Sequence, residues 1–213
     1  MADLRFDLAV IAQELRGKTG QTVLDVGCGD GALMAVLRDE YGIDARGIEI
    51  DPELVEKCVS RGLSVVQGDA NRDLAQYPDN AFDYTVLGQT LQTSARPDKT
   101  LEELLRVGRT AFISFPNFAH WRTRSALLLG GRMPITKALP VSWYETANIH
   151  HVTVEDFRGL VKEQGARIER RWFFSDGKEI GTPGAAWVRC ICAISQTPMA
   201  TRSAAFTVRA NRT

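Results

Sequence analysis

The sequence lacks an excess of charge of either sign and any long apolar run. Lysine plus arginine and aspartate plus glutamate are equal, at 26 each, so the chain has no large basic field of the kind that nucleic-acid binding uses. No run reaches the roughly 18 apolar residues that a membrane helix needs, and the N-terminus has no apolar stretch of signal-peptide length. We therefore expect a cytoplasmic protein that binds neither nucleic acid nor a membrane.

Cysteine and histidine are also scarce, with four and three residues. The cysteines are Cys28, Cys58, Cys190 and Cys192. No two of them have the Cys-x-x-Cys spacing of a zinc site, and we expect buried free thiols in a reduced compartment, because a free thiol behaves as a small hydrophobe. Cys190 and Cys192 alternate and should share one side of a strand. Adjacent His150 and His151 would point apart, so we expect no metal site.

Familiar catalytic arrangements are missing as well. The sequence contains no Walker loop, no Ser-His-Asp arrangement and no pair of carboxylates with a clear task. A histidine could act as a general base, because the unperturbed imidazole pKa lies near neutral pH. We assign no catalytic residue from the sequence.

Strand-like and helix-like segments alternate along most of the chain. Apolar runs predict seven strands, at residues 22–26, 45–50, 63–67, 82–87, 110–115, 168–174 and 187–194. Apolar residues at helical spacing predict helices at 32–40, after Pro52, around 101–105 and at 154–163. Repeated strand–helix–strand units indicate an α/β fold with a doubly wound, mainly parallel sheet. The last two strands would form an antiparallel edge hairpin.

The domain organisation follows from length and from two changes in composition. A chain of 213 residues suits one domain, which we place at 1–195. Residues 117–152 are rich in aromatics, glycine and proline, and we expect an insertion there, over the carboxyl edge of the sheet. Residues 196–213 are small and polar with scattered arginine, which is typical of a flexible tail.

The insertion carries a local excess of positive charge. Its cations are Arg122, Arg124, Arg132 and Lys137, and no Asp or Glu lies between Asn117 and Tyr144. This excess could receive an anionic substrate or an acidic partner surface. The alternative is a solvated helix face with buried Leu127–Leu129 behind it. Exposed Trp121, Trp143 and Tyr144 would favour an interface, whereas buried ones would form only a small local core.

A glycine-rich loop follows the first strand. It reads Asp25-Val26-Gly27-Cys28-Gly29-Asp30-Gly31. Three alternate glycines remove the β-carbons that would hold a ligand away from the backbone, and the following helix N-terminus offers N–H donors. The looser Gly-x-Gly-x-x-Gly/Ala spacing of dinucleotide binders is also satisfied, and a tight turn without any ligand is a further alternative.

The next three strands also end in residues suited to a nucleoside ligand. Glu49, followed by Ile50, could accept hydrogen bonds from both ribose hydroxyls, which fits NAD and S-adenosylmethionine (SAM) equally. Asp69 could accept a hydrogen bond from an adenine amino group, with small Ala70 leaving room for the ring, although helix capping is the alternative for Asp69. Gly88 and Gln89 follow the fourth strand, where the methionine part of SAM would lie.

This set of strand-end residues resembles the pattern of class I SAM-dependent methyltransferases, with their Rossmann-like fold. Asp25 and Asp30 place negative charge beside the loop, which suits a sulfonium and an ammonium group and would repel a pyrophosphate. The resemblance implies SAM, or S-adenosylhomocysteine, as the cofactor. The predicted cofactor-binding residues are Asp25, Gly27, Cys28, Gly29, Gly31, Glu49, Ile50, Asp69, Ala70, Gly88 and Gln89.

Several longer phrases resemble the bacterial methionine biosynthesis family MetW over about residues 4–175. Beside the glycine loop these include Gly88-Gln89-Thr90-Leu91-Gln92, Ser114-Phe115-Pro116-Asn117, His120-Trp121-Arg122, Gly131-Arg132-Met133-Pro134 and Asn148-Ile149-His150. The resemblance implies a methyltransferase-like fold and a role beside homoserine O-acyltransferase, the enzyme that activates homoserine on the way to methionine. It implies no catalytic residue.

Three functions remain open at this point. The first is a SAM-binding accessory or regulatory subunit that contacts the acyltransferase through the insertion and reports SAM, the downstream product of the pathway. The second is an active methyltransferase on a small molecule, which needs no general base because the sulfonium is already activated and alignment supplies much of the rate. The third is an NAD-dependent enzyme. The sequence leaves the oligomeric state open.

Overall fold

The chain folds around one mixed sheet of eight strands, in the order β3-β2-β1-β4-β5-β8-β6-β7. The computed structural model describes residues 4–135, 141–175, 178–180 and 189–196. The strands are β1 (Thr22–Val26), β2 (Asp44–Glu49), β3 (Ser64–Gln67), β4 (Phe82–Gly88), β5 (Gly108–Phe115), β6 (Ala166–Ser175), β7 (Lys178–Ile180) and β8 (Arg189–Gln196). The first five run parallel, and β8 pairs antiparallel with both β5 and β6.

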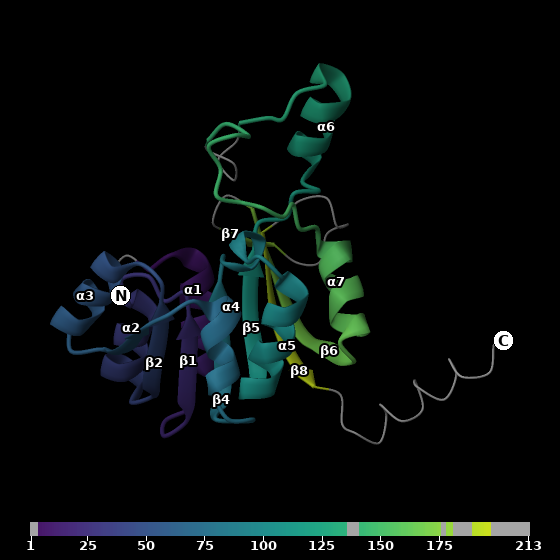
Figure 1. Cartoon of the computed structure of the whole chain (residues 1–213). Helices are drawn as coiled ribbons and strands as arrows, with labels where there is room; N and C mark the ends of the chain where they lie inside the picture. Colours follow the sequence, from purple (N-terminus) through teal and green to yellow (C-terminus); the bar gives the residue numbers. More distant parts are fainter. Residues whose placement is uncertain (1–3, 136–140, 176–177, 181–188, 197–213) are drawn as a thin grey trace, which may run out of the picture.

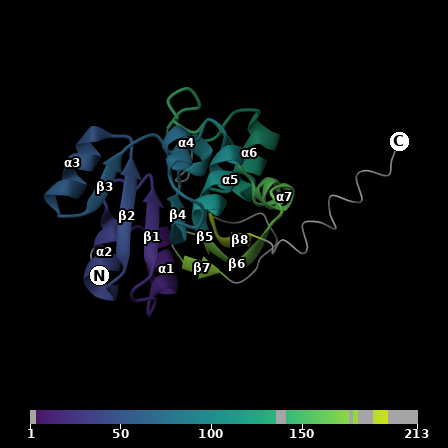
Figure 2. The same ribbon diagram turned by 60° about the horizontal axis from the view of Figure 1, so that its bottom comes forward.

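Helices cover both faces of this sheet, as the doubly wound prediction requires. They are α1 (Phe6–Leu15), α2 (Ala32–Tyr41), α3 (Pro52–Ser60), α4 (Ala70–Asp73), α5 (Pro97–Val107), α6 (Trp121–Gly130) and α7 (Val154–Glu163), with short 3-10 turns at Leu74–Gln76 and Leu91–Thr93. Figure 2 shows α1 and α2 on one face and α5 and α7 on the other. The central strands are therefore buried on both sides, which explains why they are apolar at consecutive positions.

Local sequence explains where the helices begin. Pro97 occupies the first turn of α5, and Leu101, Leu104 and Leu105 form the buried side of that helix. Thr153 caps α7, its side chain accepting a hydrogen bond from the Asp156 N–H at 3.1 Å. These helices close the core over β4, β5 and β6, and α7 has the predicted bounds.

The predicted strands are present, and the structure adds to them. β7 is an extra three-residue strand beyond β6. Gln196, which we assigned to the tail, is the last residue of β8; the rest of the predicted tail lies outside the described residues. Among the residues described, no helix is both long enough and apolar enough to cross a membrane. The four cysteines are free and buried, and the sulfurs of Cys190 and Cys192 lie 3.3 Å apart, on one side of β8 as predicted.

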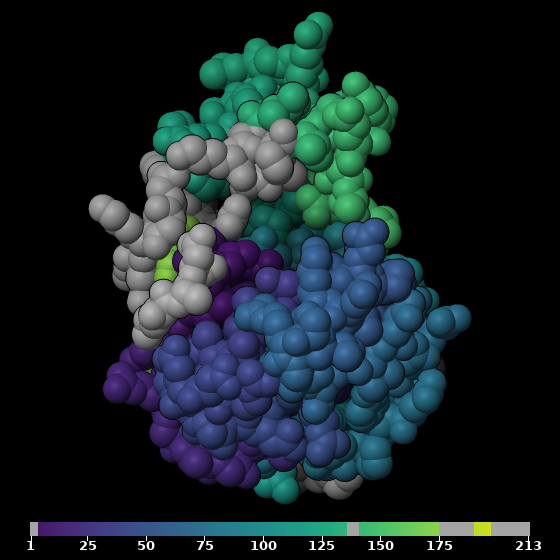
Figure 3. Space-filling view, turned by 90° about the vertical axis from the view of Figure 1, so that its left-hand side faces the viewer, coloured from purple at the N-terminus to yellow at the C-terminus, as the bar shows by residue number. Residues whose placement is uncertain are grey.

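The described part of the segment 117–152 stands above the carboxyl ends of the parallel strands (Figure 1). Its helix α6 has only one buried residue, Thr123. Leu128 and Leu129 are 85% and 86% exposed, and Leu127 is exposed as well, so the alternative with Leu127–Leu129 buried behind a solvated face is wrong. The reason is that the segment containing α6 projects from the rest of the molecule (Figure 3). These leucines therefore lack a packing surface.

Candidate functional site

The glycine loop lies at the point where the order of the strands reverses. β1 and β4 are neighbours, with Val26 beside Leu87, and the chain leaves them toward opposite edges of the sheet. Loops 27–31 and 88–90 therefore face each other at the carboxyl edge, where open α/β sheets bind ligands. A β-carbon on Gly27, whose φ is +71°, would lie 2.9 Å from Thr90 Oγ1, so this close approach requires glycine.

Most N–H groups of the loop are already used within the chain. Gly27 and Cys28 donate to the Ile48 carbonyl at 2.8 and 3.2 Å, and Gly31 donates to the Cys28 carbonyl at 3.1 Å. Gly29 donates to Glu49 Oε2 at 2.8 Å. The loop thus offers fewer free donors than its sequence suggested, because it folds back over the end of β2. An anion such as a pyrophosphate would find few of these groups free.

The Glu49 side chain holds the glycine loop against the end of β2 by hydrogen bonds. Its side chain is 7% exposed, and Oε1 accepts hydrogen bonds from the N–H groups of Ile50 and Asp51 at 2.8 and 3.1 Å. A carboxylate can accept about four hydrogen bonds, and three come from backbone here, so capacity for a hydroxyl remains. The neighbouring Ile50 side chain is 64% exposed, an apolar surface at the rim of the site.

Asp25 is a buried carboxyl group beneath the loop. Its side chain is 2% exposed and accepts no hydrogen bond from any residue that the structure describes. Burial raises the pKa of Asp25 to about 7; the Arg5 guanidinium opposes this, and the nearby carboxyl groups of Glu49 and Asp7 add to it. A cation placed beside Asp25 would stabilise its ionised form.

The glycines of the loop differ in what surrounds them. A β-carbon on Gly31, with φ +75°, would meet Leu63 Cδ1 at 2.4 Å and Cys58 Sγ at 3.0 Å, whereas one on Gly29, with φ +60°, would meet nothing within 4 Å. Gly31 is thus required by packing, and Gly29 faces open space of the kind a ligand could fill. The Cys28 side chain packs with Met34, Cys58 and Leu63, so only its backbone can face a ligand.

Asp69 takes the capping alternative that the sequence left open. Its Oδ1 accepts from the Asn71 N–H at 2.9 Å and from Asn71 Nδ2 at 2.8 Å, and these bonds hold the pKa of Asp69 below its usual value. Ala70 begins α4 directly beside it and is half-buried. The contacts of both residues with an adenine ring stay predictions.

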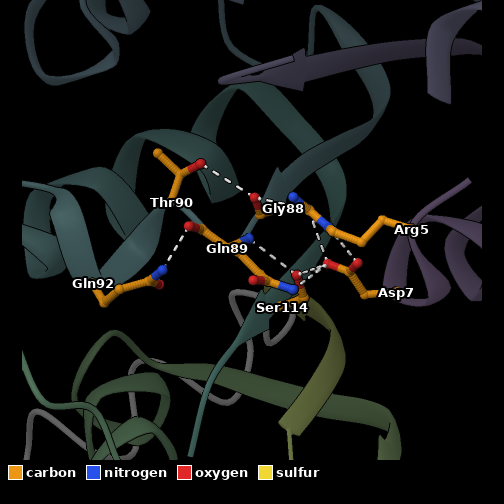
Figure 4. A network of polar contacts seen from close by, with 7 residues as sticks. All are labelled: Arg5, Asp7, Gly88, Gln89, Thr90, Gln92 and Ser114. Atoms are coloured by element: carbon orange, nitrogen blue, oxygen red, sulfur yellow. Dashed lines mark hydrogen bonds and ion pairs between the residues drawn. The ribbon is translucent and has the colours of Figure 1, made fainter. Parts of the chain in front are cut away.

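Sequence reasoning missed the polar network beneath Gly88 and Gln89 (Figure 4). Asp7 on α1 is 1% exposed; it accepts hydrogen bonds from Arg5 at 2.6 and 3.0 Å and from Ser114 Oγ at 2.6 Å. Arg5 Nη2 also donates to the Gly88 carbonyl at 3.1 Å. The network therefore joins α1, β4 and β5 at the methionine end of the predicted site.

Gln89 has an unusual backbone conformation that this network supports. Its φ is +57°, in a region that residues other than glycine rarely adopt. Its N–H donates to Ser114 Oγ and to the Ser114 carbonyl, each at 3.0 Å, and its carbonyl accepts from Gln92 Nε2 at 2.6 Å. Strained residues held this firmly cluster at functional sites.

The described residues do not form a metal centre. In the part of the chain that the structure describes, no three His, Cys, Asp or Glu side chains are grouped so that they could hold an ion. The absence of a metal in the working protein stays a prediction.

A comparison with protein families identifies the family of this chain. The model of the methionine biosynthesis protein MetW matches residues 5–196. The chain belongs to the MetW family. It is also 34% identical, over 172 residues, to the bifunctional methionine biosynthesis protein MetXA/MetW of Rhodopirellula baltica. The matched region covers 76% of this chain but only 28% of that longer relative.

Solved structures place this MetW-family chain in the class I methyltransferase fold. A SAM-dependent methyltransferase from Archaeoglobus fulgidus aligns with TM-score 0.63 and 17% identity, over 89% of this chain and 94% of that one. The [4+2]-cyclase SpnF aligns with TM-score 0.64 and 18% identity, over 90% and 81%. At these identities the likeness shows the fold, and one of these two proteins is named for a reaction other than methyl transfer, so the fold alone gives no reaction.

Proposed function

We propose that this MetW-family chain binds SAM at the carboxyl ends of β1, β2 and β4. The observation that carries this proposal is the buried pair of acidic residues, Asp25 and Glu49, around a glycine loop that opens into free space at Gly29. In this arrangement Glu49 would bind the ribose hydroxyls, and Asp25 would favour the cationic methionine end. Exposed Ile50, with Asp69 and Ala70, would contact the adenine, while Gly88 and Gln89 would border the methionine.

The same geometry favours SAM over NAD. Two buried acidic residues flank the loop, and the loop donates most of its N–H groups to its own chain. A pyrophosphate needs free N–H donors and is repelled by carboxylates at short range. A sulfonium or an ammonium group is attracted by the carboxylates, and as a cation it needs no N–H donor from the loop.

Replacing Glu49 by glutamine is expected to weaken SAM binding about tenfold, since losing one charged hydrogen-bond partner costs on the order of 1.4 kcal/mol. Glutamine is the milder change, because its one oxygen can still accept from Ile50 and Asp51 and only the Gly29 N–H loses its acceptor, whereas Glu49→Ala leaves all three backbone N–H groups without one. Titration calorimetry with SAM, S-adenosylhomocysteine and NAD gives the affinities. Glu53→Gln, at an exposed position on α3, is the control; equal SAM affinity in both variants, or preference for NAD, would overturn the proposed site.

We further propose that the chain acts in methionine biosynthesis as a SAM-responsive partner of homoserine O-acyltransferase. Membership of the MetW family supports a role in methionine biosynthesis, and the Rhodopirellula baltica relative unites MetXA and MetW in one chain. A contact between the proposed cofactor site and the insertion supports this proposal. The carbonyl of Gln92, whose side chain holds Gln89, accepts hydrogen bonds from the N–H groups of Ile149 and His150 in the insertion, at 2.9 and 3.0 Å.

Saturating SAM is accordingly expected to change the affinity of the chain for the acyltransferase by fivefold or more, the lower end of common coupling energies of about 1–3 kcal/mol. Complex formation and acyltransferase rate would be measured with the purified pair, with and without SAM. The Glu49→Gln variant should need about tenfold more SAM for the same effect. If neither affinity nor rate responds to SAM, the regulatory role is excluded.

One observation favours methyl transfer as a second function. Gln92 Oε1 and His150 Nε2 are buried and have no hydrogen-bond partner within the structure described, and their backbones are bonded to each other beside Gln89. Buried polar atoms are normally paired, so a hydroxyl or amine of a small acceptor would satisfy them. Analysis of the same reaction mixtures for S-adenosylhomocysteine tests this function, and no release with any homoserine-derived metabolite counts against it.

A further inference from the structure

Exposed apolar side chains are concentrated in one part of the molecule. Of the twelve large apolar side chains that are exposed among the described residues, nine lie between Trp121 and Ile149. They are Trp121, Leu127, Leu128, Leu129, Ile135, Val141, Trp143, Tyr144 and Ile149. We call the described part of this segment, residues 121–135 and 141–149, the insertion lobe. Apolar patches of this kind mark interaction surfaces on soluble proteins.

The insertion lobe is also positively charged. Arg122, Arg124 and Arg132 are exposed, and none of them forms an ion pair with a residue that the structure describes. Glu145 is the single acidic residue between positions 117 and 152. A surface that joins exposed arginines to exposed aromatic and leucine side chains has the composition of a binding hot spot.

From these observations we infer that the insertion lobe is the docking surface for an apolar groove with a carboxylate-lined rim, and that this groove belongs to the acyltransferase. The inference rests on the proposed function for the identity of the partner. In it, Leu128, Leu129 and the T-shaped pair of Trp143 and Tyr144, whose ring centroids are 5.5 Å apart, fill the groove, and the arginines meet the rim.

A second copy of the chain is a poorer occupant. A symmetric dimer contact brings the same patch of both copies together, so the positive charges of Arg122 and Arg124 would enter the interface from both copies. Like charges in an interface are unfavourable, and the insertion has Glu145 alone to compensate them. An acidic partner meets no such repulsion.

A membrane surface also fits the lobe less well than a groove. Leu127, Leu128 and Leu129 are consecutive on α6, and neighbouring residues of a helix point about 100° apart. Three consecutive leucines therefore cover more than half of the circumference of the helix. A flat bilayer surface buries a single stripe, whereas a groove that encloses the end of α6 can bury all three.

The relative from Rhodopirellula baltica supports the choice of partner. Its MetW-like part is joined to MetXA in a single chain, so the two parts are held at high effective concentration whatever their affinity. Where the two parts are separate chains, their surfaces would have to recognise each other without that tether. An exposed lobe anchored at its base, through Gln92 and through the Phe118 N–H, which donates to the Val152 carbonyl at 3.1 Å, is suited to that task.

The test uses the full chain and the homoserine O-acyltransferase of the same organism. The double variant Leu128→Ser with Leu129→Ser is expected to weaken the complex at least tenfold, as removal of hot-spot side chains does. The double variant Arg122→Glu with Arg124→Glu should also weaken the complex, and this loss of affinity should grow as the salt concentration is lowered. SAM affinity and melting temperature should not change, because these side chains are exposed. The matched control is Val59→Ser with Val66→Ser, two exposed apolar residues outside the lobe.

The outcomes separate this inference from the proposed function. A wild-type complex that the lobe variants leave intact overturns the inference and leaves the partnership standing, while absence of any complex overturns both. Sedimentation velocity and flotation with anionic vesicles address the other occupants. A wild-type dimer, or vesicle binding, that the leucine variant abolishes while the acyltransferase complex persists would assign the lobe to that occupant instead.

Discussion

A Gly31→Ala variant is expected to lose about 2–3 kcal/mol of folding free energy, from the positive φ and from overpacking together. Gly31 caps α2 with φ +75°, and the new methyl group would lie 2.4 Å from Leu63 Cδ1 and 3.0 Å from Cys58 Sγ. Both partners are buried in the small cluster under α2, so they can move only by disturbing it. Chemical denaturation of the chain without ligand, with the midpoint and slope compared with wild type, measures this loss.

Gly29→Ala is the matched variant, because it differs in what the methyl group meets. With φ +60° it carries the backbone penalty of about 1 kcal/mol, and its methyl group contacts nothing within 4 Å. The chain should therefore stay folded, while SAM binding falls steeply, because the methyl group occupies the space proposed for the cofactor. Wild-type SAM affinity in Gly29→Ala would show that the ligand does not approach this side of the loop.

The parallel half of the fold was predictable because its signals are local. Strands buried on both faces are apolar at consecutive positions, and glycine and proline mark the turns between them. The helix α1 was not predicted, although Leu8, Ile11, Ala12 and Leu15 have helical spacing and Asp7 is the single acidic residue on its buried side.

The site was predictable where strand ends converge, and not where distant segments meet. Asp25 and Glu49 come together because parallel strands end at one edge of the sheet. The hydrogen bond from Ser114 to Asp7 joins residues 107 positions apart, and no local pattern encodes it. The exposure of Leu127–Leu129 was equally undetermined, since a docking helix and a core helix have the same apolar residues.

The stability of the chain without ligand is expected to fall by about 3 kcal/mol between pH 5 and pH 8.5 through Asp25 alone, at 1.36 kcal/mol for each pKa unit. The pKa of Asp25 is raised from 3.8 to about 7 in the folded chain, so between these values the folded chain keeps a proton that the unfolded chain has lost. The Asp25 contribution is therefore complete below pH 3.8, declines as the pH rises toward 7, and is constant above it.

Asp25→Asn removes this titration and should flatten the decline by the same amount. Urea unfolding at pH 5, 7 and 8.5 compares the two chains, and Asp30→Asn, at an exposed neighbour in the loop, controls for the loss of one carboxylate. A wild-type profile that does not differ from that of Asp25→Asn would mean that Asp25 titrates at its ordinary pKa and that water reaches it.

The same carboxyl group ties cofactor binding to pH. A cation beside Asp25 stabilises the carboxylate and lowers its pKa, so SAM binding near pH 6 should release a proton, and SAM affinity should rise as Asp25 ionises, by up to tenfold for each pH unit below 7. Calorimetry in two buffers of different ionisation enthalpy counts the protons released. Proton release should disappear in Asp25→Asn and persist in Asp30→Asn. Wild-type binding without proton release between pH 5.5 and 7 would mean that the cationic end of SAM lies away from Asp25, because a positive charge in contact with a half-protonated carboxyl group must displace its proton.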